Sequence, residues 1–342
     1  AAGYNLEMLA QEAAEFFPKV VSCQGPEDVS ISKLPAQCRM VSQEEVASHP
    51  EVDMVVAASV GKAGLRPIMA ALEAGKPVVL ANKEPVVMAG EIVMAQARRN
   101  GTDILPVDSE PSAIWQCLRG EDKEVSRVII TASGGPFRKR SPKDLSTVTP
   151  NEALRHPTWS MGRKISIDSA TLMNKGFEVI EAHWLFDLPW EKIDVVVHPQ
   201  SIIHAMVEFA DGSVKAQLSP PDMRLPIQYA LFYPQRVKNS ALPSFSPVET
   251  GALTFEELDV SRYPCFQIAL EAGRKGLTYP AVLSAADEVA VELFLAGAIA
   301  FTDIPNLVEW VLSKHEPTSA SDLEGILEVD DWARKMAYTW AK

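Results

Sequence analysis

The sequence predicts an α/β protein in which a parallel sheet carries helices on its faces and a helical domain follows. In the first half of the 342-residue chain, short apolar runs alternate with segments of helical spacing. From about residue 264 onward, helical spacing continues with no strand-like run between the segments. The composition, 47% hydrophobic and 23% charged, is typical of a globular protein, and the length allows more than one domain.

Charge and cysteine content narrow the class of partner. The net charge is −13 and the basic residues form no long run, so we expect no nucleic-acid partner. No apolar run approaches the roughly 20 residues that span a bilayer, and no secretory or transit segment opens the chain, so we expect no membrane partner and a cytoplasmic location. The four cysteines lack CxxC spacing, which argues against a zinc knuckle or a disulfide framework.

Three short apolar runs in the first half are predicted strands. They are residues 53–59, 77–81 and 102–106. Helical spacing over 62–73 and 84–99 separates them, which predicts a parallel sheet. The polar segments AASVGKAG, ANKEP and PVDSE follow the three strands, and ligands of such sheets bind beyond the carboxyl ends of strands. Three strand ends are therefore expected to point at one crevice.

The middle of the chain predicts another strand, a loop and a long helix. Residues 127–132 form a predicted strand that runs into SGGPF, whose small residues let the backbone approach a ligand closely. A short helix near 151–155 precedes the loop HPTWSMGRK (156–164), which could pack into the core or form a lid. From Asp168, with Asp or Ser as its cap, a long helix is predicted to run through Phe186.

The remaining elements complete the pattern. Residues 194–198 predict a strand, and 207–218 predict a hairpin that turns at Asp211 and Gly212. Prolines and weak periodicity mark 231–258 as a connector. Four helices are predicted after it, at 264–276, 279–296, 303–313 and 320–341.

The stretch PVDSEPSA sets two carboxylates, Asp108 and Glu110, around a serine. On an extended backbone alternate side chains share a side, so these two acids are expected to point together. Such a pair needs a cation, a shared proton or solvent. If Glu178 on the predicted long helix meets them, three carboxylates form an all-oxygen site for Mg²⁺ or Mn²⁺, with Glu181 as a neighbour. An acidic turn and a helix face, both in water, remain the alternatives.

A second group of side chains is suited to a phosphate. It supplies hydroxyl, imidazole, amide and ammonium groups from Ser133, His156, Ser169, Asn174 and Lys175. Each of these residues alone is more often a cap or a surface residue. Together, beside the acids, they suggest a phosphorylated, metal-chelated substrate. The histidines His183, His198 and His204 are interpreted as structural.

Five segments form a specific series: PVDSE, TASGGPFR, HPTWSMGRKISIDSATLMNKGFEVIEA, HPQSIIH and PPDMRLPI. The series resembles the signatures of the 1-deoxy-D-xylulose 5-phosphate reductoisomerase family, and the similarity extends across nearly all 342 residues. The resemblance implies a homodimer in which a Rossmann-like dinucleotide-binding domain precedes an α/β catalytic domain with a lid loop and a C-terminal helical bundle. The corresponding divisions are a partial NADPH-binding domain at 1–107, the metal and substrate domain at 108–230, a connector at 231–260 and the helical domain at 261–342.

The resemblance also implies roles for individual residues. Metal ligands would be Asp108, Glu110 and Glu178. Catalytic residues would be Lys83, Glu110, Lys175 and Glu178. Contacts to the phosphosugar substrate would come from Lys83, Ser109, Glu110, Ser133, His156, Trp159 as the lid residue, Ser169, Asn174, Lys175 and Glu178. Contacts to NADPH would come from Gly3, Tyr4, Asn5, Asn82, Glu84, Met161, Gly162 and Met223.

The implied activity is metal-dependent isomerisation of 1-deoxy-D-xylulose 5-phosphate and its NADPH reduction to 2-C-methyl-D-erythritol 4-phosphate for isoprenoid precursors. The chain departs from the family at its start, because AAGYNLEML resembles the end of a second strand followed by a helix that Asn5 caps. One βα unit with its Gly-rich turn is therefore expected to be missing. The alternative function is a non-catalytic protein that binds phosphosugar and metal without a complete cofactor site. A general sugar-phosphate dehydrogenase fits the three carboxylates and the tryptophan lid less well.

Overall fold

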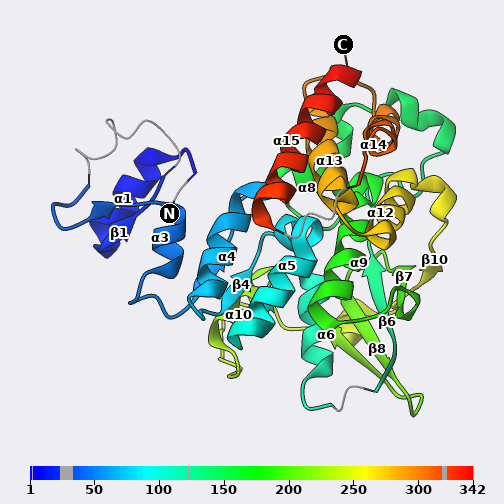
Figure 1. Ribbon diagram of the computed structural model, residues 1–342. Helices are drawn as coiled ribbons and strands as arrows, with labels where there is room; N and C mark the ends of the chain where they lie inside the picture. Colours follow the sequence, from blue (N-terminus) through cyan, green and yellow to red (C-terminus); the bar gives the residue numbers. More distant parts are fainter. Residues whose placement is uncertain (2, 24–33, 122–123, 318–321, 342) are drawn as a thin grey trace. The chain divides into compact units, whose positions relative to one another are not determined.

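The computed structural model describes residues 1, 3–23, 34–121, 124–317 and 322–341 (Figure 1). The chain forms two compact units. Unit 1 comprises Ala1–Asn82 and Val93–Leu105, and unit 2 comprises Lys83–Ile92 and Pro106–Lys342. The sheets are mixed with helices throughout, which confirms the predicted α/β class.

Unit 1 consists of short strands and the helices that connect them. In chain order its elements are α1 (Leu6–Phe16), β1 (Val20–Val21), β2 (Arg39–Met40), α3 (Gln43–Ser48), β3 (Val55–Ala57), the 3-10 turn η2 (Gly61–Gly64), α4 (Leu65–Glu73), β4 (Val78–Leu80) and β5 (Ile104–Pro106). Strands β3 and β4 pair in parallel in a sheet of order β3-β4-β5, which confirms the three predicted strands at shorter lengths. The Asn5 side chain accepts a hydrogen bond from the Met8 amide at 3.1 Å, so the predicted cap of α1 is confirmed.

Helix α5 (Glu84–Asn100) contains an irregular turn and contributes to both units. Ala89 has a non-helical backbone (φ −140°, ψ 25°), and the division between the units falls shortly after it, between Ile92 and Val93. The first turns of α5 therefore belong to unit 2. Val87 of this part is buried in the main core of that unit.

Unit 2 contains a five-stranded mixed sheet of order β10-β7-β6-β8-β9. Its strands are β6 (Val125–Ala132), β7 (Ile193–Val197), β8 (Ile203–Phe209), β9 (Val214–Leu218) and β10 (Glu256–Glu257). Strands β6 and β7 are parallel and the other pairs are antiparallel, so the predicted strands and the hairpin that turns at Gly212 (φ +82°) are confirmed. The sequence reading missed β10, because two residues inside the predicted connector carry no periodicity.

Helices of unit 2 contribute to two apolar cores. They are α6 (Ser109–Leu118), α7 (Pro150–Ala153), α8 (Arg163–Thr171), α9 (Met173–Phe186), α10 (Arg224–Phe232), α11 (Pro247–Thr250), α12 (Pro264–Lys275), α13 (Tyr279–Leu295), α14 (Asp303–Ser313) and α15 (Leu323–Trp340), with 3-10 turns η3 (Pro142–Thr147), η4 (Trp190–Lys192) and η5 (Val260–Arg262). Buried residues of α8, α9 and α12 to α15 share the larger core, whereas those of α6 belong to the second core, beside the sheet. The four predicted C-terminal helices are thus confirmed. In the described part of the chain, no helix combines the length and the apolar character that a bilayer crossing needs.

The predicted long helix from Asp168 to Phe186 is wrong, because two helices occupy this segment. Leu172 adopts a left-handed backbone (φ 56°, ψ 17°) that ends α8 and starts α9. The Thr171 hydroxyl accepts a hydrogen bond from the Met173 amide at 3.3 Å, which satisfies one of the free amides at the new helix start. Asp168 lies inside α8 instead of capping it.

Candidate active site

Three carboxylates meet in unit 2, as the sequence predicted. One oxygen from each of Asp108, Glu110 and Glu178 lies within 4.8 Å of the others. The expected extended backbone at PVDSE is wrong, because Asp108 caps α6 by accepting from the Ser109 amide at 3.0 Å and Glu110 lies in the first helical turn. The cap position of Asp108 and the first-turn position of Glu110 place these two acids side by side at the start of α6, and Glu178 comes from α9.

Two buried lysines contact these acids. The Lys83 ammonium donates to Asp108 and, at 2.7 Å, to the Asn174 side-chain Oδ1, and it lies 3.7 Å from Glu178. The Lys175 ammonium donates to Glu178 and, at 2.7 Å, to Glu110. Since the Asn174 amide also donates to Glu178, the acids and the lysines form one connected network.

The acids of this network differ strongly in proton affinity. Burial, and next the charge of Glu110, raise the pKa of Glu178 to about 8. Burial opposes ionisation of Glu110 as well, but the Lys175 ammonium lowers its pKa to about 2. Glu181 lies 3.9 Å from the Lys83 ammonium, and burial raises its pKa well above the usual range. The network therefore has more carboxylates than its two lysines neutralise.

The donor set fits a hard divalent cation. All three converging side chains offer carboxylate oxygens, the ligand type that Mg²⁺ and Mn²⁺ prefer. The raised pKa of Glu178 reflects a buried site that lacks positive charge, which an added cation would supply. Asp108, Glu110 and Glu178 are thus the residues that could hold a metal ion.

His156 connects the predicted lid loop to Ser133. Its Nδ1 accepts hydrogen bonds from the backbone amides of Thr158 at 3.1 Å and Trp159 at 2.9 Å. An accepting Nδ1 carries no proton, so the neutral ring carries its proton on Nε2, which lies 2.9 Å from Ser133 Oγ and donates to it. Ser133 Oγ also accepts from the Gly135 amide at 3.1 Å, so its own hydrogen is free to donate to an anion.

Ser133 is held by a tight backbone turn after β6. Gly134 and Gly135 have φ of +82° and +69°, and a Cβ on Gly135 would lie 2.6 Å from the Ser169 carbonyl oxygen of α8. The small residues of SGGPF were predicted to let the backbone approach a ligand, and in the structure Gly135 makes a close approach to the backbone of α8. The Tyr263 hydroxyl donates to the Gly134 carbonyl at 3.0 Å, a support that the sequence reading missed because Tyr263 lies far away in the chain.

Trp159 lies beside the metal-site helix α6. It lines one small hollow together with Ser109 and His204, and its ring centroid is 6.1 Å from that of His204. His204 is buried and contacts Ser219 Oγ at 3.1 Å, and His198 contacts the Thr254 carbonyl at 2.8 Å. These contacts, and the stacking of His183 on Trp190 at 4.0 Å, agree with structural roles for the three histidines.

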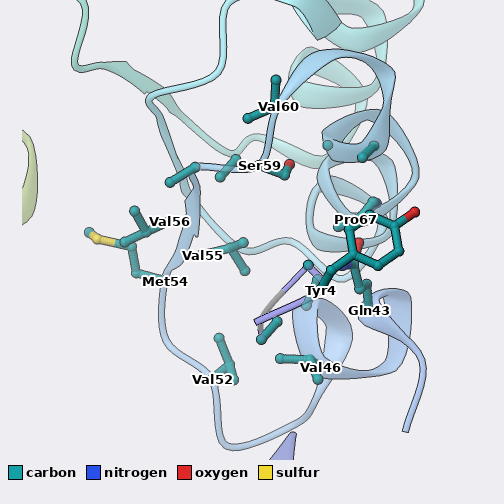
Figure 2. A pocket seen from close by; sticks show the side chains of 17 residues that line it. Tyr4, Gln43, Val46, Val52, Met54, Val55, Val56, Ser59, Val60 and Pro67 are labelled. Carbon is teal, nitrogen blue, oxygen red and sulfur yellow. The ribbon is translucent and has the colours of Figure 1, made fainter. Parts of the chain in front are cut away.

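The residues predicted to contact NADPH lie in both units. In unit 1, Gly3 and Tyr4 line a cavity of about 600 Å³ beside β3, α3 and α4 (Figure 2). Asn82 is buried and donates to the Gly61 carbonyl at 2.9 Å, so it supports the turn that follows β3. The unit 2 residues are Glu84 at the start of α5, Met161 and Gly162 just before α8, and Met223 just before α10.

Family comparisons cover most of the chain. Residues 1–90 match the model described as 1-deoxy-D-xylulose 5-phosphate reductoisomerase. Residues 104–186 match the C-terminal domain of that enzyme, and 218–336 match a further DXP reductoisomerase C-terminal domain model.

Individual relatives agree with the family models. The 1-deoxy-D-xylulose 5-phosphate reductoisomerase of Pelotomaculum thermopropionicum is 52% identical, over 98% of this chain and 88% of the relative. The Zymomonas mobilis enzyme, solved in complex with NADPH, has a TM-score of 0.90 at 39% identity and covers 100% of this chain and 90% of its own. A DOX-P reductoisomerase solved with NADPH, fosmidomycin and magnesium has the same TM-score and identity over 99% and 91%. The chain therefore belongs to the 1-deoxy-D-xylulose 5-phosphate reductoisomerase family.

Proposed function

We propose that this protein isomerises 1-deoxy-D-xylulose 5-phosphate and reduces the product with NADPH to 2-C-methyl-D-erythritol 4-phosphate. The observation that carries this function is the convergence of Asp108, Glu110 and Glu178 beside two buried lysines, in a chain 52% identical to a reductoisomerase. It is an NADPH-dependent oxidoreductase that uses a divalent metal ion, for isoprenoid precursor synthesis. The titles of related structures name NADPH and magnesium, which supports both cofactors.

The acid trio holds the metal ion in this proposal. Bound Mg²⁺ or Mn²⁺ supplies Lewis acidity toward the substrate oxygens where charge builds up as the carbon skeleton rearranges. Lys83 and Lys175 already donate to the trio, so each is placed to donate to substrate oxygens next to it. Glu110 and Glu178 are assigned as both metal and substrate contacts, and Glu181 acts on Lys83 and not as a ligand.

The substrate phosphate is bound by Ser133, Ser169, Asn174 and Lys175, with Ser109 and His156 as further contacts. Ser133 supports this role most directly, because its hydroxyl hydrogen is the donor left over after two hydrogen bonds to its oxygen. The phosphate is remote from the reacting carbons, so its binding energy can position the substrate and close the loop at 156–164. Trp159 is the lid residue that then excludes water.

NADPH supplies the hydride for the aldehyde that the rearrangement forms. We assign its contacts to Gly3, Tyr4, Asn5, Asn82, Glu84, Met161, Gly162 and Met223. In support, Gly3 and Tyr4 line the cavity of unit 1 at the carboxyl end of β3, where dinucleotides bind in parallel sheets (Figure 2).

Turnover separates this function from the alternative of a non-catalytic binding protein. We expect NADPH oxidation with 1-deoxy-D-xylulose 5-phosphate and Mg²⁺, followed at 340 nm by absorbance, and loss of turnover by about 10²-fold or more in Glu178→Gln. Calorimetry should then show weaker Mg²⁺ binding in Glu178→Gln. Metal-dependent phosphosugar binding without any turnover in the wild-type protein would instead support the alternative.

Several finer assignments remain predictions. They are the homodimer, the cytoplasmic location and the domain divisions at 107, 230 and 260. Light scattering of the purified protein would test the dimer.

A further inference from the structure

Lys164 is a buried cation that the proposed chemistry does not use. It lies in the first turn of α8, directly after the lid loop, and its side chain is 21% exposed. Its ammonium is 2.6 Å from Asp168 Oδ2 and 2.9 Å from Asp287 Oδ2, and 3.6 Å from Glu84 Oε1. It also lies over the Phe177 ring, 4.9 Å from the centroid.

Four helices therefore meet at one ammonium. Glu84 opens α5, Asp168 lies in α8, Phe177 in α9 and Asp287 in α13. Asp287 is fully buried and Phe177 has no exposed surface. All four helices contribute these residues within unit 2.

Helix electrostatics do not account for a lysine at this position. The N-terminal end of a helix carries partial positive charge and disfavours a cation in the first turn. Arg163 and Lys164 both lie in the first turn of α8, which has no acidic residue there. Arg163 is exposed, whereas Lys164 reaches inward to three carboxylates. Its position is thus explained by its partners.

The neighbours of these partners belong to the proposed site. Glu84 follows Lys83, which donates to Asp108, and Glu84 is itself assigned to NADPH. Lys164 follows Gly162, also assigned to NADPH, by two residues. Phe177 precedes the metal ligand Glu178.

We propose that Lys164 is a positioning residue, which fixes the end of the lid loop and the start of α5 against α13 so that Gly162 and Glu84 are held for NADPH. This inference rests on the proposed function and adds a residue that is assigned no contact to metal, substrate or NADPH. Lys164 does not contact substrate in this scheme. Its removal frees two segments that carry cofactor contacts, so cofactor binding suffers more than the chemical step.

The test uses Lys164→Met, which keeps the length of the side chain and removes the charge, in the full chain. We expect the KM for NADPH to rise about tenfold, the size typical of losing a partner that orients a ligand residue, with a much smaller change in kcat. Hydrogen exchange of the ligand-free protein should increase in peptides that cover 156–163. Asp287→Asn weakens the same anchor from α13, and we expect the same pattern from it.

Arg334→Met is the matched control. Arg334 of α15 forms an ion pair with Glu288 of α13 at 2.5 Å and with Asp330 of its own helix at 2.7 Å. Its side chain is 23% exposed, close to the 21% of Lys164. It lies outside the proposed site. We expect it to lower the melting temperature without raising the KM for NADPH or the exchange of 156–163.

The outcomes are distinct. An unchanged KM for NADPH and unchanged exchange of 156–163 in Lys164→Met, with a melting temperature lowered as in Arg334→Met, would show a purely structural lysine and overturn the proposal. If Lys164→Met does not fold, Asp287→Asn decides by the same two measurements. A wild-type protein without turnover would refute the proposed function, and the exchange of 156–163 would still report on the anchor.

Discussion

At the scale of single residues, His156 shows how one ring can organise two parts of a site. Its Nδ1 holds the backbone of Thr158 and Trp159, and its Nε2 holds Ser133. The two functions use opposite roles, acceptor and donor, so the neutral ring is required. The sequence predicts His156 as a phosphate-site residue, but its hydrogen bonds to the backbone of Thr158 and Trp159 became visible only in the structure.

Substitution of His156 by either of two amide side chains, Asn or Gln, can separate its two roles. In His156→Asn, the Asn oxygen can replace Nδ1 as the acceptor and no donor reaches Ser133. In His156→Gln, the longer amide can reach Ser133 and the acceptor near the backbone is lost. We expect Asn to raise the KM for the phosphosugar about fivefold, the effect of roughly 1 kcal/mol for one hydrogen bond, with little change in exchange of the 158–159 amides. Gln should raise that exchange, and identical behaviour of the two variants would contradict the separation.

The order of the loop at 156–164 should also depend on pH. Burial lowers the pKa of His156 in the folded protein, so the folded loop binds the proton less tightly than a free histidine, whose pKa is about 6.5. The contribution of His156 to loop order is thus complete above about pH 6.5 and is lost as the pH falls toward its lowered value. Exchange of peptides 156–163, corrected for the intrinsic pH dependence, should increase below that point in the wild type. His156→Asn should not show the increase, because its amide does not titrate.

At the scale of elements, the site depends on how closely α9 approaches α12. Gly176 lies between Lys175 and the proposed metal ligand Glu178, and a Cβ at this position would be 2.4 Å from the Ala269 Cβ of α12. No normal contact is that short, so an added methyl group must move one of the helices. The packing of α9 against α12 therefore fixes the position of two site residues.

We expect Gly176→Ala to destabilise the protein by roughly 1–3 kcal/mol, although alanine favours helix formation more than glycine does. Urea unfolding measures the loss, and turnover should also fall because α9 carries Glu178. The double variant Gly176→Ala/Ala269→Gly restores the space and should recover part of both. Gly→Ala at position 176 without loss of stability would show that the helices can separate freely.

The elements also show which parts of the structure the sequence could predict. The longer strands, the hairpin and the four C-terminal helices follow from periodicity and turn residues, whereas the two-residue strands β1, β2 and β10 do not. The acid trio follows from its motifs. The break at Leu172 could not be predicted, because a leucine with φ of 56° follows no local preference and the helical spacing continues through it. The start of α6 at Ser109 was also not predicted. The apolar run before Asp108 predicts an extended segment, although aspartate is equally a favoured helix cap.

At the scale of the whole molecule, the proposed metal and substrate residues are confined to unit 2. Lys83 is the first residue of unit 2 in the chain. The chain leaves this unit after Ile92 and returns to it at Pro106. The net charge of −13 opposes a phosphosugar at long range, so binding depends on the local donors near Ser133 and Lys175. A bound divalent ion would add positive charge beside these donors, so metal binding and substrate binding are expected to be coupled.

This confinement predicts where ligands stabilise the chain. Mg²⁺ with fosmidomycin, the pair named for a related solved structure, should slow hydrogen exchange around α6, α8 and α9 of unit 2 and raise the melting temperature. A ligand at about 100 times its Kd stabilises the folded state by roughly 2.7 kcal/mol if it does not bind the unfolded chain. Asp108→Asn removes a proposed metal ligand and should abolish the combined effect, because fosmidomycin then meets the acids without the cation that they are proposed to hold. NADPH should still slow exchange around the unit 1 cavity in this variant, since Gly3 and Tyr4 are untouched. Loss of both responses in Asp108→Asn would mean that the substitution unfolds the protein or that the two sites are not independent, and circular dichroism distinguishes these two cases.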